Sequence, residues 1–104
     1  MYRVTTPTNT FTLPFSTSEC SVIQISYKQG QNELLKQYED GVCPPGMTLD
    51  DDTVLITLTQ QETKAFGKGT VTAQVRVLTT GGKAYASQKF TIGVNDVLNE
   101  EILS

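Results

Sequence analysis

Hydrophobic and polar residues alternate along most of this chain, a pattern typical of strands that bury one face. The longest alternation lies in Thr70–Thr79, where every second residue from Val71 to Val77 is Val or Ala. Shorter stretches repeat the same period, and we expect strands at Thr10–Phe15, Cys20–Lys28, Glu33–Glu39, Thr53–Thr59 and Ala84–Val94. Between them, Asp40–Asp52 is rich in Gly, Pro and Asp and holds at most a short strand around Met47–Leu49 that crosses between sheets.

The alternation also predicts which side chains face the core. Pro14 removes a backbone donor, so the first strand is expected at a sheet edge or to end in a bulge. Thr80-Gly81-Gly82-Lys83 predicts a tight hairpin into the last strand. The expected inward residues are Phe11, Leu13, Phe15, Ile23, Ile25, Tyr27, Val54, Ile56, Leu58, Ala86, Phe90, Ile92 and Val94, with Leu34, Lys36 and Tyr38 on one face of their strand and Leu35 on the other.

Two short segments depart from the strand period. Thr59-Gln60-Gln61-Glu62 has the form of a capping box, which predicts a helical turn over Gln60–Phe66. Ala65 or Phe66 would then close the end of the core, and Gly67 would stop the turn. Near the C-terminus, Asp96 could cap a last helical turn with Leu98 and Ile102 on one side.

The length of 104 residues suits one domain, residues 1–104, that buries a real hydrophobic core. Frequent Thr, Val, Ile, Tyr and Phe favour strands. We therefore expect an all-β fold: an immunoglobulin- or fibronectin-III-like β-sandwich of about seven antiparallel strands, with a short helical turn between the fifth and sixth.

The net charge of −3 is mild, but its distribution is uneven. Seven acids and one base, Lys36, lie in Glu33–Glu62, whereas five bases and no acid lie in Thr63–Asn95. Surface complementarity within the fold is the favoured interpretation, because small asymmetries are common and are screened by salt. The alternative is a weakly bipolar surface that orients copies or partners.

The opening residues Met1–Pro7 lack the charged, apolar and cleavage regions of a signal peptide, so we expect synthesis and folding in a cytoplasm. No apolar run is long enough for a membrane helix, and no membrane partner is expected. Cys20 and Cys43 are expected to be reduced thiols, since a disulfide would need an oxidising compartment. An immunoglobulin-type pair would also place Cys43 on a strand and a Trp between the two cysteines, and the chain has no Trp.

The chain contains no histidine, which removes the usual nucleophile–base pairs, His-based metal sites and the common general base at neutral pH. Asp50-Asp51-Asp52 is the one carboxylate cluster; without EF-hand spacing, an acidic turn is favoured over a calcium site. Gly67-Lys68-Gly69-Thr70 lacks the upstream glycine of a phosphate-binding loop and leads into a strand, so it is interpreted as a turn. We predict no enzyme activity and no catalytic, cofactor-binding or metal-binding residue.

Binding functions leave a little more room. The bases are not interleaved with aromatic residues and the pI is near 4.7, so nucleic acid is not expected as a partner. Tyr2, Tyr38 and Tyr85 suit stacking on a sugar, although packing between strands is the commoner role of such tyrosines.

Four stretches carry a resemblance to known proteins: Tyr2–Phe15, Leu58–Thr63 followed by Phe66, Val75–Thr79, and Asp96–Leu103. Together they resemble a family of short proteins encoded in the tail-gene region of phages and prophages of Gram-positive bacteria. The chain is more distantly similar to the immunoglobulin-like N-terminal domain of siphophage upper baseplate proteins. Cys20 and Cys43 are not part of the family's pattern, and the resemblance supplies no catalytic residue.

The resemblance implies a non-enzymatic virion component, a phage tail or baseplate structural or accessory protein. Its expected partners are other phage tail or baseplate proteins, with copies of itself as a further option. Its expected location is the host cytoplasm during assembly and then the virion. The alternative is a carbohydrate-binding module that recognises host cell-surface glycan. The apolar C-terminal residues Val97, Leu98, Ile102 and Leu103 either fold back onto the domain, which is favoured, or dock on a neighbouring subunit.

Overall fold

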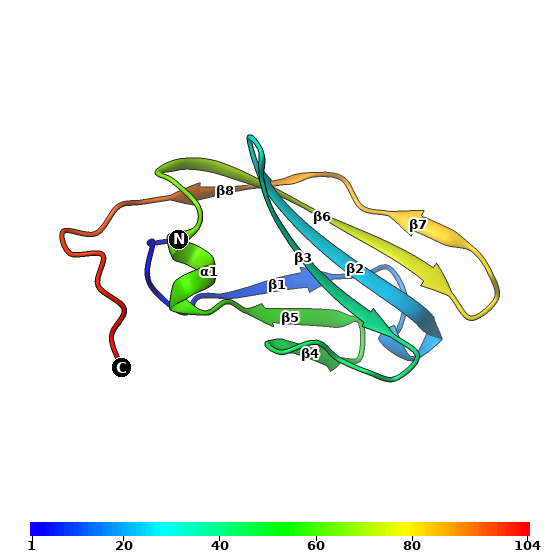
Figure 1. The fold of residues 1–104 in the computed structure, drawn as a ribbon. Helices are drawn as coiled ribbons and strands as arrows, with labels where there is room; N and C mark the ends of the chain where they lie inside the picture. The colour runs from blue at the N-terminus through cyan, green and yellow to red at the C-terminus, as the bar shows by residue number, and fades with distance from the viewer.

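Eight strands form two antiparallel sheets in the computed structural model, which describes residues 1–104 (Figure 1). The smaller sheet has three strands in the order β1-β5-β4: β1 (Thr8–Thr12), β5 (Thr53–Thr57) and β4 (Met47–Asp50). The larger sheet has five strands in the order β3-β2-β6, followed by β7 and β8, which both pair with β6. Their bounds are β2 (Cys20–Gln29), β3 (Asn32–Glu39), β6 (Gly69–Thr79), β7 (Ala84–Ala86) and β8 (Phe90–Val94).

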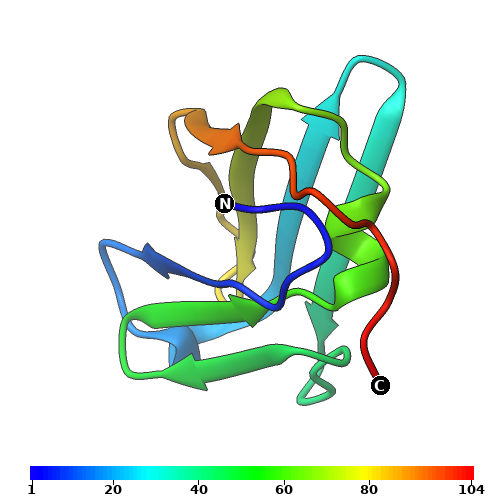
Figure 2. The ribbon, with the colours of Figure 1, turned by 90° about the vertical axis from the view of Figure 1, so that its left-hand side faces the viewer.

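The predicted alternation places the core between the two sheets (Figure 2). In the central pair, Ile23 lies opposite Val77 and Ile25 opposite Val75, and all four side chains are almost completely buried. The smaller sheet contributes Val54 and Ile56 from β5 and Phe11 from β1. Sixteen buried residues form one hydrophobic cluster. The expected all-β architecture of two antiparallel sheets is confirmed.

The last expected strand, Ala84–Val94, is broken, which is why there are eight strands. Ser87 takes over the bonding to β6 at the break: its amide donates to the Val75 carbonyl oxygen (2.8 Å) and its hydroxyl accepts from the Val75 amide (3.0 Å). The break shifts the alternation by one residue. Tyr85 therefore packs against the core and Ala86 is exposed, which corrects the predicted inward position of Ala86.

Beyond the break, Ile92 and Val94 face inward as predicted. Phe90 lies at the margin, 37% exposed, and its ring contacts Phe11 at 5.7 Å between centroids.

Two kinds of contact close the sides of the sandwich. Between β1 and the β7–β8 edge lie edge-to-face aromatic pairs, Phe11–Phe90 and then Phe15–Tyr85 at 5.5 Å between centroids. On the opposite side, Lys36 of β3 points inward beneath the helix, and its Nζ lies 2.7 Å from Glu62 Oε2. An inward charge on an edge strand also discourages pairing with a foreign strand.

A helical turn closes one end of the core, as predicted. Helix α1 (Gln60–Lys64) begins after Thr59, whose hydroxyl accepts from the Glu62 amide (3.1 Å) while Glu62 Oε1 accepts from the Thr59 amide (2.9 Å). Phe66 follows and is only 2% exposed. The stretch Ser16–Glu19, whose sequence predicts a turn before the Cys20 strand, forms the 3₁₀ turn Thr17–Glu19, and it begins with a second capping box between Ser16 and Glu19.

The predicted helical turn after Asp96 does not form: residues 96–104 contain neither helix nor strand. A short segment gains too few backbone hydrogen bonds to offset helix nucleation, and here the chain is pulled aside by other contacts. No helix in the chain has the length and apolar character needed to cross a membrane.

Candidate functional site

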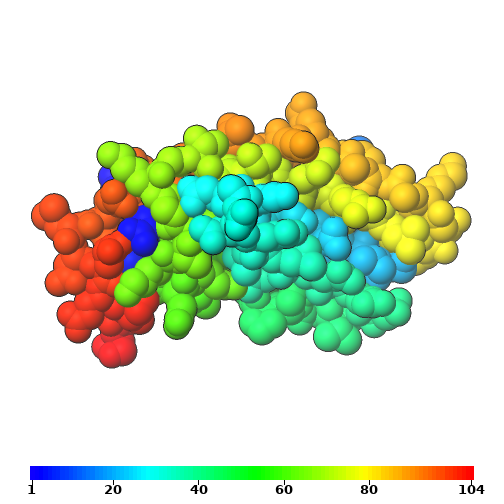
Figure 3. All heavy atoms as spheres, turned by 45° about the horizontal axis from the view of Figure 1, so that its top comes forward, coloured from blue at the N-terminus to red at the C-terminus, as the bar shows by residue number.

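The C-terminal apolar segment (Val97, Leu98, Ile102 and Leu103) lies at the end of the sandwich that also holds the N-terminus and α1 (Figures 2 and 3). The path begins at a parallel bridge between Tyr2 and Asn95. There the Asn95 amide donates to the Met1 carbonyl oxygen (2.8 Å) and the Arg3 amide donates to the Asn95 carbonyl oxygen (2.9 Å). Hydrogen bonds thus join the N-terminal residues Met1 and Arg3 to Asn95, which follows the last strand.

Arg3 ties three chain segments together at this end. Its Nε donates to the Phe66 carbonyl oxygen (2.5 Å) and its Nη2 to the Lys64 carbonyl oxygen (2.9 Å). These are carbonyls at the C-terminal end of α1, which have no partner inside the helix. Nη1 forms ion pairs with Asp96, at 3.4 Å, and with Glu100. The guanidinium therefore draws the C-terminal residues toward the helix.

The side chain of Gln60 fixes the C-terminal apolar segment a second time, by binding its backbone at Leu103. Its Nε2 donates to the Leu103 carbonyl oxygen (2.7 Å), and its Oε1 accepts from the Leu103 amide (2.8 Å). The backbone of the segment therefore folds back onto its own domain, as the favoured interpretation expected.

The apolar side chains of the segment are nevertheless mostly left in solvent. Leu98 is fully exposed, Leu103 is 75% exposed and Ile102 is 39% exposed. Tyr2, at the same end, is 58% exposed. Single exposed apolar residues are ordinary on a protein surface, but here they gather on one segment that is held by polar contacts. The arrangement presents apolar side chains without burying them.

Glu62 connects this end of the sandwich to the β3 edge through its ion pair with Lys36. Partial burial on its own raises the pKa of Glu62, but hydrogen bonds from Lys36 and Thr59 outweigh burial and lower the pKa below its usual 4.5. Lys36 also donates to the Pro45 carbonyl oxygen (3.1 Å). Glu62 thus links α1 to β3 through its ion pair with Lys36.

The remaining shifted groups lie inside the domain. Burial raises the pKa of Tyr27 to about 12, although its hydroxyl accepts a hydrogen bond from Asn9 Nδ2 (3.1 Å). Burial, together with the charge of Glu19, raises the pKa of the Cys20 thiol. A thiol with a raised pKa is a poor nucleophile. Both cysteines are free: Cys20 is buried and Cys43 is exposed.

Asp50-Asp51-Asp52 forms the tight turn between β4 and β5. Its carbonyl oxygens hold the segment after β1: Asp51 accepts from the Thr17 amide (2.6 Å), and Asp52 accepts from the Leu13 amide (2.7 Å). No group of three or more His, Cys, Asp or Glu side chains is arranged to hold a metal ion. The cluster has a structural place as a turn.

Gly67-Lys68-Gly69 is a turn held by one side chain of the neighbouring hairpin. Gln29 Oε1 accepts from the Gly67 amide and Gln29 Nε2 donates to the Gly67 carbonyl oxygen, both at 2.7 Å. The Gly67 amide is therefore already occupied, and the loop leads into β6 rather than into a helix.

The three tyrosines considered for sugar stacking do not share a surface. Tyr38 and Tyr85 lie in one row of the larger sheet, at its two edges, separated by Ile23 and Val77. Both pack against the core. Tyr2 lies at the end that holds the chain termini.

No family model, no curated protein and no solved structure matches this chain. The site therefore has to be interpreted from its own geometry.

The anchors of the C-terminal segment, Arg3 and Gln60, were not singled out by sequence reasoning. Both contact residues far away along the chain, and nothing in their local pattern marks them. The one signal in the sequence is charge: Asp96, Glu100 and Glu101 are acids near the C-terminus, and Arg3 is the only base in the first 27 residues.

Proposed function

We propose that this chain is a non-enzymatic structural or accessory protein of a phage tail or baseplate, which acts through protein–protein contacts. Its partners would be other tail or baseplate proteins, and its location the host cytoplasm during assembly and then the virion. The resemblance of four stretches of the sequence to tail-region proteins suggests the phage setting. The geometry of the C-terminal apolar segment supports the mode of action.

One observation carries the proposal: Leu98 and Leu103 remain exposed although the backbone around them is anchored by Arg3 and Gln60. Burying an exposed leucine is worth about 1.5–3 kcal/mol. A partner that covers both side chains gains this energy, and the anchoring limits the entropy lost when the segment is immobilised.

Strand order supports the finer assignment of an immunoglobulin- or fibronectin-III-like sandwich. Immunoglobulin domains place strands B, E and D in one sheet and C, F and G, with C′ in variable types, in the other. The orders β1-β5-β4 and β3-β2-β6-β7 follow this arrangement if strand A is missing and β1 corresponds to B. A helical turn between β5 and β6 then lies between E and F. Neither cysteine lies on β1 or β6, so the inter-sheet disulfide has no counterpart here.

A non-enzymatic role is favoured by the residues at the site. The exposed end offers leucines, an arginine engaged with carbonyls and carboxylates, and a glutamine engaged with the backbone. With no histidine in the chain, general base chemistry near neutral pH has no obvious carrier. A carbohydrate-binding module has less support, because Tyr2, Tyr38 and Tyr85 do not form a common platform.

The proposal is tested in phage particles released by the bacterium that carries the gene. We expect mass spectrometry of purified particles to detect the chain, and the double variant Leu98→Ser with Leu103→Ser to be depleted at least about tenfold. Both positions are exposed, so the variant should fold normally. Leu35→Ser with Val42→Ser removes two exposed apolar side chains elsewhere and should leave incorporation unchanged. Recovery of the wild-type chain outside the particles only, or equal incorporation of the Leu98/Leu103 variant, would contradict the proposal.

A further inference from the structure

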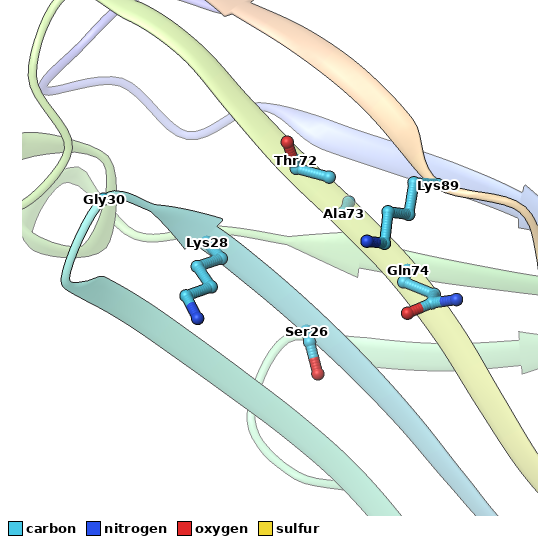
Figure 4. Close-up of a pocket in the computed structure, with 7 residues that line it drawn as sticks. All are labelled: Ser26, Lys28, Gly30, Thr72, Ala73, Gln74 and Lys89. Carbon is cyan, nitrogen blue, oxygen red and sulfur yellow. The ribbon is translucent and has the colours of Figure 1, made fainter.

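The larger sheet leaves its outer face, the face turned away from the smaller sheet, open to solvent. Lys28 of β2 and Lys89, in the break before β8, flank β6 on this face, and Thr72 and Gln74 project between them (Figure 4). With Ser26 these residues line a shallow depression, here called the basic hollow. At the break in the last strand, Gln74 Nε2 donates to the Ser87 carbonyl oxygen (2.8 Å), which fixes the Gln74 side chain beside the hollow.

The two lysines of the basic hollow form no ion pair within their own chain. The ion pairs of the chain join Arg3 to Asp96 and Glu100, and Lys36 to Glu62. Lys28 lies opposite Glu33 across the β2–β3 pair, yet the two do not form an ion pair. No ion pair therefore joins the acidic segment Glu33–Glu62 to the basic segment Thr63–Asn95. The favoured interpretation of the charge asymmetry, surface complementarity within the fold, has no such contact behind it.

The acidic counterpart is also unpaired. Asp50, Asp51 and Asp52, here called the acidic hairpin, form the turn between β4 and β5, and Asp50 and Asp51 are exposed. Their side chains take part in none of the ion pairs. The hairpin belongs to the smaller sheet and the hollow to the outer face of the larger sheet, so the sandwich itself lies between them. One chain cannot bring the two together.

We propose that the acidic hairpin of one copy docks in the basic hollow of a second copy. A turn is convex and the hollow is concave, and their charges are opposite, which favours a specific and oriented contact. The contact is head-to-tail, so a pair of copies still has one free hairpin and one free hollow, and the assembly can grow into an open chain or close into a ring. This surface is separate from the C-terminal apolar segment and does not depend on the function proposed for it.

Sedimentation velocity of the purified chain tests the proposal. We expect the average mass to rise above the 11.4 kDa of the monomer with increasing concentration. It should fall back in about 1 M salt, where the Debye length is about 3 Å. Lys28→Glu with Lys89→Glu, which destroys the hollow, should be monomeric. Asp50→Asn with Asp51→Asn and Asp52→Asn, which neutralises the hairpin, should be monomeric too.

Mixing these two variants gives the decisive result. Each retains the half of the contact that the other lacks, so the mixture should form a discrete 1:1 dimer that cannot grow further. Lys68→Glu with Lys83→Glu changes the net charge by the same amount outside the hollow and should associate like the wild-type chain. The proposal is overturned if the wild-type chain stays monomeric or if the mixed variants do not pair. A monomer that binds an acidic peptide but not a second copy would overturn it as well.

Discussion

At the scale of single residues, Gly46 is constrained by its backbone conformation and Lys36 by the burial of its charge. Gly46 precedes β4 with φ +86°, and a Cβ there would lie 2.4 Å from the Thr57 carbonyl oxygen. The Thr57 amide in turn donates to the Gly46 carbonyl oxygen (2.8 Å). Lys36 is 9% exposed, and its ammonium group depends on Glu62 and Pro45 for partners.

Gly46→Ala should lower the free energy of unfolding by about 3 kcal/mol or more, because both the positive φ and the contact with the Thr57 backbone oppose a Cβ. Gly41 is a matched control, since it has φ +87° and no atom within 4 Å of an added Cβ. Gly41→Ala should cost only about 1–2 kcal/mol, the backbone part alone. Equal losses in urea denaturation would show that the close approach to Thr57 does not matter.

The pairing of Glu62 predicts a pH dependence with a definite sign. The folded state lowers the pKa of Glu62 below 4.5, so its contribution to stability is present above the unfolded value and is lost as pH falls through the lower, folded value. Glu62→Gln keeps a side chain that can complete the capping box but loses the charge. We expect the wild-type chain to exceed this variant by about 1–3 kcal/mol near pH 7. The difference should shrink toward about pH 3; a gap that stays constant with pH would contradict the assignment.

At the scale of elements, local pattern predicted the inward faces of strands that lie along the core, even though the β2–β6 pairing shifts register between Cys20 and Val22. The alternation in β2, β5 and β6 matched the observed inward faces because a whole strand lies against the core and a slip would expose its apolar side. The capping box at Thr59 could also be predicted from the sequence, because its two hydrogen bonds join residues only three positions apart. Such features depend on neighbours in the sequence.

The elements that local pattern missed depend on distant contacts. The break at Ser87 is stabilised by a hydrogen bond from the Val75 amide of β6 to the Ser87 hydroxyl. No Gly or Pro in the sequence indicates this break. The sequence predicts a helical turn after Asp96, but contacts with Arg3 and Gln60 hold the segment in a non-helical path. The basic hollow was missed for the same reason: Lys28 and Lys89 are far apart in the chain, and only the pairing of β2 and β8 with β6 brings them to one face.

At the scale of the whole molecule, the sandwich separates two exposed surfaces of different chemistry. The end that holds both chain termini presents apolar side chains, and the outer face of the larger sheet presents unpaired bases. The edges of the larger sheet are less available for pairing, since β3 carries the inward Lys36 and the β7–β8 edge is interrupted. For this sheet, contacts through an end and a face suit the architecture better than strand addition.

The stability of a chain that lacks Asn99–Ser104 tests most directly whether the C-terminal apolar segment is offered to a partner. The deletion removes two exposed Gln60–Leu103 hydrogen bonds and the ion pair between Glu100 and Arg3, and Arg3 keeps its contacts with Asp96 and with the Lys64 and Phe66 carbonyl oxygens. We expect urea denaturation to show a loss of no more than about 2 kcal/mol, with the monomer still folded. A loss above about 4 kcal/mol, or an unfolded chain, would mean that the segment serves its own domain and would contradict the proposed docking role.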